Sequence, residues 1–336
     1  MELRRRVLLL PGQGAQRERM AAGLYGGRAE FTASMDTFFD RLGGHGPALR
    51  AAWLRPAPNP AMDDATVAQP LLLGVGYALG RSVGAAGGGL DLLLGHSVGE
   101  LAAACLAGVF DAADVGALAA ARAGVLTDAG HGAMLAVAGS PRELSADLGP
   151  GVAVAALNGP RQTVLAGPAK ELADTAQRLR AGGRIVRALR SGHAFHSPVM
   201  ESTARRSGEA LLAFGPRAPR AGVTVVSSRT GAPVTAREAR DPHFWGGQLA
   251  TPVRYWPALE HLLDTWGRRP GLLLLDGSAD GSLGAPARHH PAVREGASEV
   301  VPLLARGRDC GGPGDERAFA EALARLAECG GQAAVS

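Results

Sequence analysis

Asp91-Leu-Leu-Leu-Gly-His-Ser-Val-Gly-Glu-Leu-Ala-Ala-Ala-Cys-Leu-Ala107 is the stretch that decides the fold. It begins with a short, continuous apolar run, which is typical of a buried strand. An alanine-rich segment follows from Leu101 to Ala107 and favours a helix, which Gly108 can end. The stretch therefore predicts a strand that turns sharply into a helix.

Gly95-His-Ser-Val-Gly99, at that turn, matches the pattern G-x-S-x-G. A strand before the pattern and a helix after it are what a nucleophile elbow requires, because the N-terminus of the helix presents backbone N–H groups to developing negative charge. The pentapeptide alone also arises by chance in glycine-rich chains, as a serine that caps an ordinary turn. With both flanking elements present, the pattern favours Ser97 as a nucleophile.

A similar apolar run, Arg6-Val-Leu-Leu-Leu10, lies upstream and is closed by Pro11-Gly-Gln-Gly14. Between the two runs, residues 69–79 are predicted to be helical, with Pro70 in the first turn. A strand, a helix and a strand in that order indicate a parallel sheet with a right-handed crossover. We therefore predict an α/β fold whose large domain is α/β-hydrolase-like and has a parallel sheet.

The predicted elements in residues 131–192 follow a different order. Strands and helices follow the order β-α-β-β-α-β of a split βαβ unit, and the segments are Met134–Ala138, Pro141–Leu148, Val152–Leu157, Thr163–Ala166, Ala169–Ala181 and Ile185–Leu189. We therefore predict a small ferredoxin-like domain at 131–192. It is inserted into a large domain made of residues 1–130 and 193–336.

The predicted elements after the insertion belong to the large domain, with helices at 198–213 and 252–266 and strands at 223–227 and 272–276. Residues 277–297 are rich in glycine, alanine and proline and lack clear periodicity, so we predict a loop there. A last helix at 317–329 is amphipathic, and Asp315 can cap it.

Charge and composition limit the classes of partner. The net charge is +4, and all but one of the 35 basic residues are arginines, which suits acidic or phosphate-bearing partners. A compositional bias explains the same excess equally well. Aromatic residues make up only 4% of the chain and no basic and aromatic residues interleave, so we expect no nucleic-acid partner.

The apolar segments are too short or too interrupted for a membrane. The run after Met1-Glu-Leu-Arg-Arg-Arg6 is too short for an export signal, and the stretch 101–121 is broken by Asp111 and Asp114. The 3 cysteines are too few and too scattered for a disulfide framework or a zinc site. We therefore expect a cytoplasmic protein with no membrane segment and no bound metal.

A serine nucleophile needs a base, and Gly192-His-Ala-Phe-His-Ser197 offers two candidates, His193 and His196. This segment lies where the chain leaves the predicted small domain, and clefts between domains are where pockets concentrate. Either histidine could equally be an ordinary exposed or core residue. No acidic residue lies near the segment to complete a Ser-His-Asp triad.

Four motifs together resemble one known family: Gly12-Gln-Gly-Ala-Gln16, Gly95-His-Ser-Val-Gly-Glu100, Arg122 and His193-Ala-Phe-His196. Their order and spacing are similar to those of the malonyl-CoA:acyl carrier protein transacylase family, which includes acyltransferase domains of polyketide synthases. The resemblance runs from about Val7 to Leu263. It implies transfer of malonyl from malonyl-CoA to the phosphopantetheine thiol of an acyl carrier protein, through a serine acyl-enzyme and without a bound cofactor, in polyketide or fatty acid biosynthesis.

The resemblance also implies a role for each matched residue. Ser97 is the nucleophile, and His196 is the general base and then the general acid. The backbone N–H groups of Gln13 and Val98 form the oxyanion hole. A backbone carbonyl at Gln248 orients the histidine, in place of the missing carboxylate.

The substrate-binding residues come from the same resemblance. Arg122 matches the arginine that grips the free carboxylate of malonyl, and Gln69 matches a further pocket position. Phe195 belongs to the His-Ala-Phe-His form, which usually goes with malonyl, whereas Tyr-Ala-Ser-His usually goes with methylmalonyl. His193, the first histidine of the motif, is also expected at the substrate site.

The C-terminal part departs from the family pattern. The family usually shows Gly-Pro after a strand, but here Leu275-Asp-Gly-Ser-Ala-Asp280 leads into a loop. The resemblance therefore does not define the surface that contacts the partner. No ketosynthase or carrier sequence is present, so we expect a free-standing enzyme, or an excised domain, that acts on carrier proteins in trans. The alternatives are a hydrolase that clears carrier proteins or cleaves esters, transfer of another acyl unit between carrier proteins, and a non-catalytic scaffold.

Overall fold

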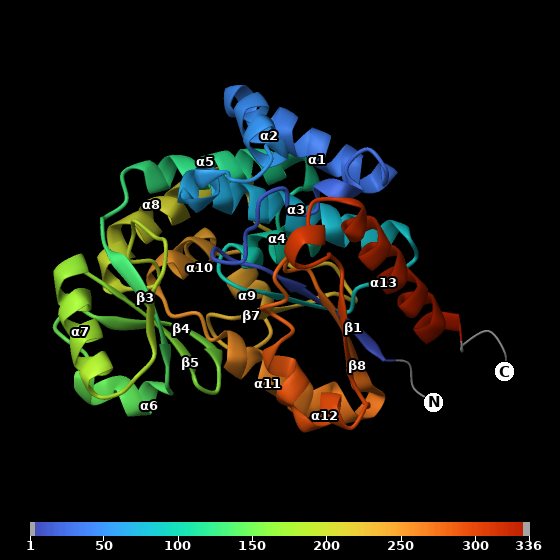
Figure 1. The fold of residues 1–336 in the computed structure, drawn as a ribbon. Coiled ribbons are helices and arrows are strands. Elements are labelled where there is room, and N and C mark those ends of the chain that lie inside the picture. Colours follow the sequence, from blue (N-terminus) through green and yellow to red (C-terminus); the bar gives the residue numbers. More distant parts are fainter. Residues whose placement is uncertain (1–3, 332–336) are drawn as a thin grey trace.

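The computed structural model describes residues 4–331, and Figure 1 shows two sheets surrounded by helices. The first three and last five residues, which belong to the predicted large domain, lie outside the described residues. None of the helices in the described part of the chain is long and apolar enough to cross a membrane.

The larger sheet has five strands in the order β7-β2-β1-β8-β9, and every neighbouring pair is parallel. Its strands are β1 (Arg5–Leu10), β2 (Leu92–Gly95), β7 (Thr224–Ser227), β8 (Leu272–Asp276) and β9 (Glu299–Pro302). The inner strands are continuous apolar runs because helices cover both faces of the sheet. The predicted α/β fold with a parallel sheet is confirmed.

Helices lie on both sides of this sheet (Figure 1). They are α1 (Ala29–Arg41), α2 (Gly46–Leu54), α3 (Ala65–Ala85), α4 (Gly99–Leu106), α5 (Val115–Thr127), α8 (Glu201–Leu211), α9 (Ala236–Ala239), α10 (Pro242–Gly247), α11 (Tyr255–Trp266), α12 (Pro291–Arg294) and α13 (Pro313–Gly331). Short 3-10 turns join them at Ala22–Leu24, Gly43–His45, Pro60–Asp63, Ala112–Asp114, Pro198–Met200, Leu212–Phe214, Gln248–Ala250, Pro286–His289 and Gly307–Asp309.

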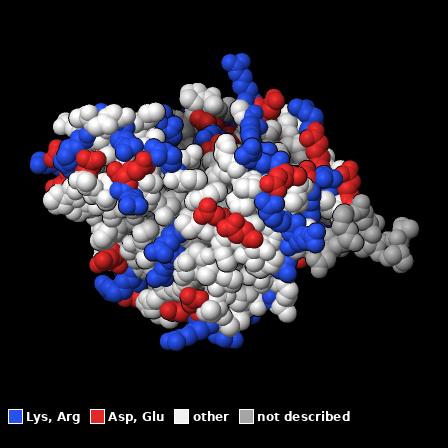
Figure 2. Space-filling view, turned by 90° about the horizontal axis from the view of Figure 1, so that it is seen from below, with Lys and Arg blue, Asp and Glu red and all other residues white. Residues whose placement is uncertain are grey.

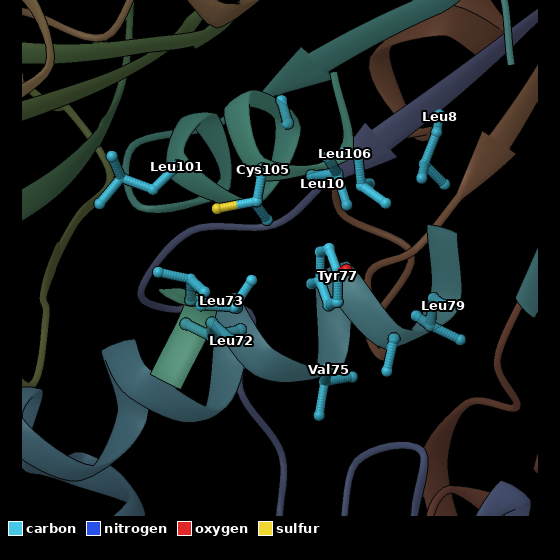
Figure 3. Close-up of a cluster of buried hydrophobic side chains, with 14 of the residues drawn as sticks. Leu8, Leu10, Leu72, Leu73, Val75, Tyr77, Leu79, Leu101, Cys105 and Leu106 are labelled. Carbon is cyan, nitrogen blue, oxygen red and sulfur yellow. The ribbon is translucent and has the colours of Figure 1, made fainter. Parts of the chain in front are cut away.

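Strand β1 shows how the core is divided. Successive side chains of a strand point to opposite faces, so Leu8 and Leu10 join the core that contains α3 and α4, as Figure 3 shows. Val7 and Leu9 join a second core with the buried leucines of α11. The strand is therefore held from both sides, and the loop that follows it has a fixed position.

The smaller sheet has four antiparallel strands in the order β4-β5-β3-β6. Its elements follow the predicted β-α-β-β-α-β order: β3 (Ala133–Ala138), α6 (Pro141–Leu144), a 3-10 turn (Ser145–Asp147), β4 (Ala153–Gly159), β5 (Gln162–Gly167), α7 (Ala169–Ala181) and β6 (Val186–Ala188). It has a core of its own, in which leucines of α7 pack on β3 and β5. We propose that 131–192 forms a domain, since an isolated bridge between His131 and His193 joins the two connecting segments.

Two predicted helix starts are wrong. Helix α3 begins at Ala65, where the Asp64 carboxylate accepts a hydrogen bond of 2.8 Å from the Thr66 amide, so Pro70 lies inside the helix and not in its first turn. Helix α13 begins at Pro313, which places Asp315 within the helix. The Asp315 carboxylate accepts instead from the amides of Gly311 and Gly23 and fastens the helix start to the N-terminal part of the chain.

The predicted loop at 277–297 is interrupted by the 3-10 turn at 286–289 and by α12. Strand β9 follows it and was not predicted. Its pairing with β8 places it at the edge of the sheet. Helices α1 and α2 were not predicted either.

Candidate active site

Ser97 lies at the turn between β2 and α4 with a φ of 52°, in the left-handed region that residues other than glycine rarely adopt. Gly95 and Gly99, by contrast, are needed because neighbouring backbone is close. A Cβ atom at Gly95 would overlap the backbone of Glu100, and one at Gly99 would overlap the carbonyl oxygen of Leu10. The serine itself therefore takes the sharp turn, and the glycines let α4 approach the sheet.

Ser97 Oγ lies 2.8 Å from Nε2 of His196, a second non-glycine residue with positive φ, at 62°. On the other side of the ring, Nδ1 lies 2.9 Å from the carbonyl oxygen of Gln248 and 3.0 Å from that of Thr251. Carbonyl oxygens only accept hydrogen bonds, so Nδ1 carries the proton. Nε2 is then the acceptor for the serine hydroxyl.

Burial, together with the nearby His96 and Arg122, lowers the pKa of His196 to about 3, although the two carbonyl oxygens act to raise it. The imidazole is therefore neutral at neutral pH. A neutral imidazole bonded to a serine hydroxyl can take its proton, which is the task of a general base.

The loop after β1 packs against this turn. Gly12 has no room for a Cβ atom because the backbone and ring of His96 are close. Within residues 4–331, the amides of Gln13 and Val98 donate no hydrogen bond to another group of the protein. These two amides are therefore available for a ligand oxygen.

Three polar side chains next to the loop are linked by hydrogen bonds. Gln69 Nε2 donates to Gln13 Oε1 at 2.8 Å, and Arg122 Nε donates to Gln69 Oε1 at 2.7 Å. Arg122 is only 4% exposed, and its Nη1 and Nη2 are buried without a partner in the described part of the chain. Burial lowers its pKa to about 10, so it stays charged at neutral pH. A buried cation with two unused nitrogens suits an anionic ligand.

A cavity of about 850 Å³ opens at Ser97 between the two sheets. Of the predicted site residues, Gln13, Gln69, Ser97, Phe195 and His196 line it, and strands β3, β4 and β5 contribute Met134, Ala136, Ala156 and Val164. Its size is in the range of small-molecule sites, about 300 to 1,000 Å³.

The remaining predicted residues, Val98, Arg122, His193 and Gln248, are not among the residues that line it. His193 Nδ1 lies 3.2 Å from the carbonyl oxygen of Gly130, and the ring stacks on His131 with centroids 6.0 Å apart. The structure brings His196 to Ser97, and not His193.

No role was predicted for Glu100, Asn158 or Thr251. His96 Nε2 lies 2.9 Å from Asn158 Oδ1, which ties the serine turn to β4. Glu100 is the only acidic residue of the alanine-rich helix α4, and this contrast in the sequence could have marked the residue, although not its partners. Among the described residues, no group of three or more His, Cys, Asp or Glu side chains could hold a metal ion.

A family model described as acyl transferase domain matches residues 7–268. The chain is 33% identical over 289 residues to a phenolphthiocerol/phthiocerol polyketide synthase of Mycobacterium tuberculosis, a match that covers 85% of this chain and 19% of that protein. The chain thus spans about a fifth of the length of this relative.

Two solved structures are similar over nearly the whole chain. One is the acyltransferase domain from the second module of the salinomycin polyketide synthase, with a TM-score of 0.83 and 33% identity over 98% of this chain and 74% of that one. The other is the acyl transferase domain of SpnD in complex with 2-(pent-4-yn-1-yl)malonyl, with a TM-score of 0.87 and 29% identity over 99% of this chain and 78% of that one. These matches confirm the predicted resemblance.

Proposed function

Because this chain belongs to the acyl transferase domain family, we propose that it moves malonyl from malonyl-CoA to the phosphopantetheine thiol of an acyl carrier protein. We choose malonyl because of the surroundings of Arg122. Its guanidinium has two buried nitrogens without a partner in the described part of the chain, and it is close enough to lower the pKa of His196. A carboxylate held there by a bidentate pair would place the acyl carbonyl near the serine.

In the first half-reaction, Ser97 Oγ attacks the thioester carbonyl while His196 Nε2 takes the hydroxyl proton. The amides of Gln13 and Val98 donate to the oxyanion, and one such donor is worth about 3 to 4 kcal/mol. When the C–S bond breaks, the imidazolium returns the proton to the sulfur of coenzyme A. The products are malonyl-Ser97 and free coenzyme A.

In the second half-reaction, the pantetheine thiol gives its proton to His196 and its sulfur attacks the ester carbonyl. The same oxyanion donors act again. The C–O bond to Ser97 breaks, and the imidazolium protonates the serine oxygen. The enzyme is regenerated and the carrier leaves as a malonyl thioester.

The acceptor is proposed from the family and from the arginine excess. Figure 2 shows basic and acidic side chains interspersed on the face seen from below, where neither sign predominates. The carrier is therefore expected to approach the mouth of the cavity and not that face as a whole. We place the reaction in the cytoplasm and in polyketide biosynthesis, since Cys105, Cys310 and Cys329 are free thiols and the matched relative is a polyketide synthase.

Intact mass spectrometry tests this function. Mixed with malonyl-CoA, the protein should gain one malonyl group that persists in buffer and disappears when a carrier protein with its phosphopantetheine arm is added. Transfer of the label to the carrier completes the test. Rapid loss of the label to water, with or without carrier, would instead indicate a hydrolase.

Replacing Arg122 by alanine should change which acyl donor is used. Truncating one side of a desolvated charge pair costs about 2 to 5 kcal/mol, so loading from malonyl-CoA should fall by about 30- to several-thousand-fold. Acetyl-CoA has no carboxylate and leaves the wild-type guanidinium unpaired, so acetyl loading should be unchanged or faster. The measurement is kcat/KM for both donors.

Arg205→Ala, on the exposed face of α8, is a control that should leave both donors unaffected. Arg122→Lys keeps the charge without the planar fork and should lie between wild type and Arg122→Ala. A parallel loss for both donors in Arg122→Ala would mean that the arginine supports the fold and does not read the carboxylate.

A further inference from the structure

Glu100 is the last residue of the serine motif, and the proposed reaction does not use its carboxyl group. It lies on α4, three positions after Ser97, and is only 1% exposed. Its Oε1 accepts from the Ser227 hydroxyl at 2.8 Å and from the Ser228 amide at 2.6 Å. Burial raises the pKa of the carboxyl, and these donors oppose that effect.

The other carboxylate oxygen, Oε2, accepts from Gln248 Nε2 at 2.9 Å. The same Nε2 donates to the carbonyl oxygen of Ser97 at 2.6 Å, so both hydrogens of the amide are used. Through its own main-chain carbonyl, Gln248 also accepts from His196 Nδ1. One residue thus contacts the main chain of the serine and the ring of the histidine.

The orientation of the Gln248 side chain depends on Glu100. Its Oε1 is buried and has no partner within residues 4–331. Turning the amide over would not relieve this, because Oε1 would then face the oxygens of Glu100 and Ser97. The amide therefore stays in place because two acceptors hold its NH₂ group, and one of the two is the carboxylate.

We propose that Glu100 is a positioning residue for the proposed acyl transfer. Its carboxylate holds the Gln248 side chain, and so fixes the main-chain carbonyl that orients His196 and the turn that carries Ser97. In a Ser-His-Asp triad the carboxylate contacts the imidazole directly. Here the Glu100 carboxylate contacts Gln248, and the main-chain carbonyl oxygen of Gln248 contacts the imidazole.

The inference rests on the proposed function and is tested with Glu100→Gln. The glutamine has the same shape, but one acceptor becomes an NH₂ group that must face a donor, either Gln248 Nε2 or the Ser228 amide. We expect the rate of acyl-enzyme formation at saturating donor to fall about 10- to 100-fold, the range seen when hydrogen-bond partners of metal ligands are removed in other proteins. The fall should be the same for malonyl-CoA and acetyl-CoA, because both need His196.

The KM for malonyl-CoA distinguishes the proposed role from a general loss of structure in the Glu100→Gln variant. The negative charge of Glu100 raises the pKa of Arg122. Removing that negative charge does not weaken the attraction between the Arg122 guanidinium and the malonyl carboxylate. We therefore expect an unchanged or lower KM together with the lower kcat. A raised KM with an unchanged kcat would overturn the proposal.

A double-variant cycle separates this role from an independent one. Gln248→Leu keeps the main-chain carbonyl and removes the amide. If Glu100 acts through that amide, adding Glu100→Gln to Gln248→Leu should cause no further loss of rate. A double variant whose loss is the product of the two single losses would overturn the proposal.

Asp315→Asn is the matched control, since it neutralises another fully buried carboxylate that accepts from backbone amides in a different part of the fold. It should lower Tm but leave acyl-enzyme formation unchanged. If Glu100→Gln likewise lowered Tm but left the rate of acyl-enzyme formation unchanged, the inference would be overturned and the proposed function would stand. A wild-type protein that forms no acyl-enzyme would overturn the proposed function and the inference together.

If Glu100→Gln does not fold, Ser227→Ala gives the same information. It removes one donor to Oε1 and leaves the carboxylate in place. We expect a smaller loss of rate, of several-fold, that is absent in the Gln248→Leu background. An equal loss in both backgrounds would overturn the proposal.

Discussion

The Ser97→Ala variant is expected to take up no malonyl group from malonyl-CoA. Removing the oxygen atom removes the only cavity-lining hydroxyl in the described chain that is bonded to a histidine ring. In enzymes whose serine and histidine act as a unit, the loss of either lowers kcat on the order of 10⁶-fold. Intact mass spectrometry after mixing with malonyl-CoA measures the outcome directly.

Two other serines line the same cavity and provide controls for this prediction. Ser191 Oγ donates to the carbonyl oxygen of His193, and Ser282 lies on the loop after β8. Ser191→Ala and Ser282→Ala should therefore load as the wild type does. A malonyl adduct that persists in Ser97→Ala and disappears in one of these variants would move the nucleophile to another residue.

The His196→Ala variant is expected to lose overall transfer by a factor similar to that of Ser97→Ala. Without the imidazole, nothing takes the serine proton during acylation, and nothing activates the pantetheine thiol afterwards. The measurement is the rate of malonyl transfer from malonyl-CoA to the carrier, with acylation followed separately by mass.

His193→Ala is the matched control, because it removes a histidine three positions away that does not reach Ser97. Its ring is held by the Gly130 carbonyl oxygen and stacks on His131. We expect its transfer rate to stay close to that of the wild type, because the general base His196 remains bonded to Ser97. If His193→Ala were the more damaging change, the roles of the two histidines would be reversed.

The serine turn could be predicted because its information is local. An apolar run, five residues of one pattern and an alanine-rich segment stand next to each other in the chain, and each element has its own sequence signal. The βαββαβ order of the second sheet was readable for the same reason. Each of its strands is a short run bounded by turn residues.

The rest of the site depends on contacts between distant segments. Arg122 meets Gln69 across 53 residues, and Glu100 meets Gln248 across 148. Nothing in the local sequence distinguishes Arg122 from the other arginines, so only the family resemblance selected it. The role of Glu100 became visible only when its partners were in place.

The errors in the fold have particular causes. Pro70 was expected at a helix start because proline fits a first turn, but Asp64 caps the helix several residues earlier. Helix α1 was missed although Phe31, Met35 and Phe38 recur at helical spacing and are buried. Edge strand β9 is short, and its four residues carry too little pattern to stand out from the loop before it.

The positive φ angles of Ser97 and His196 set stability against chemistry. A side chain in this backbone region costs on the order of 1 to 3 kcal/mol, whereas glycine adopts it freely. Arg19 and Ala21 adopt positive φ as well, but Ser97 and His196 are bonded to each other, so replacing either by glycine would relieve the backbone only by removing a group that the proposed reaction uses.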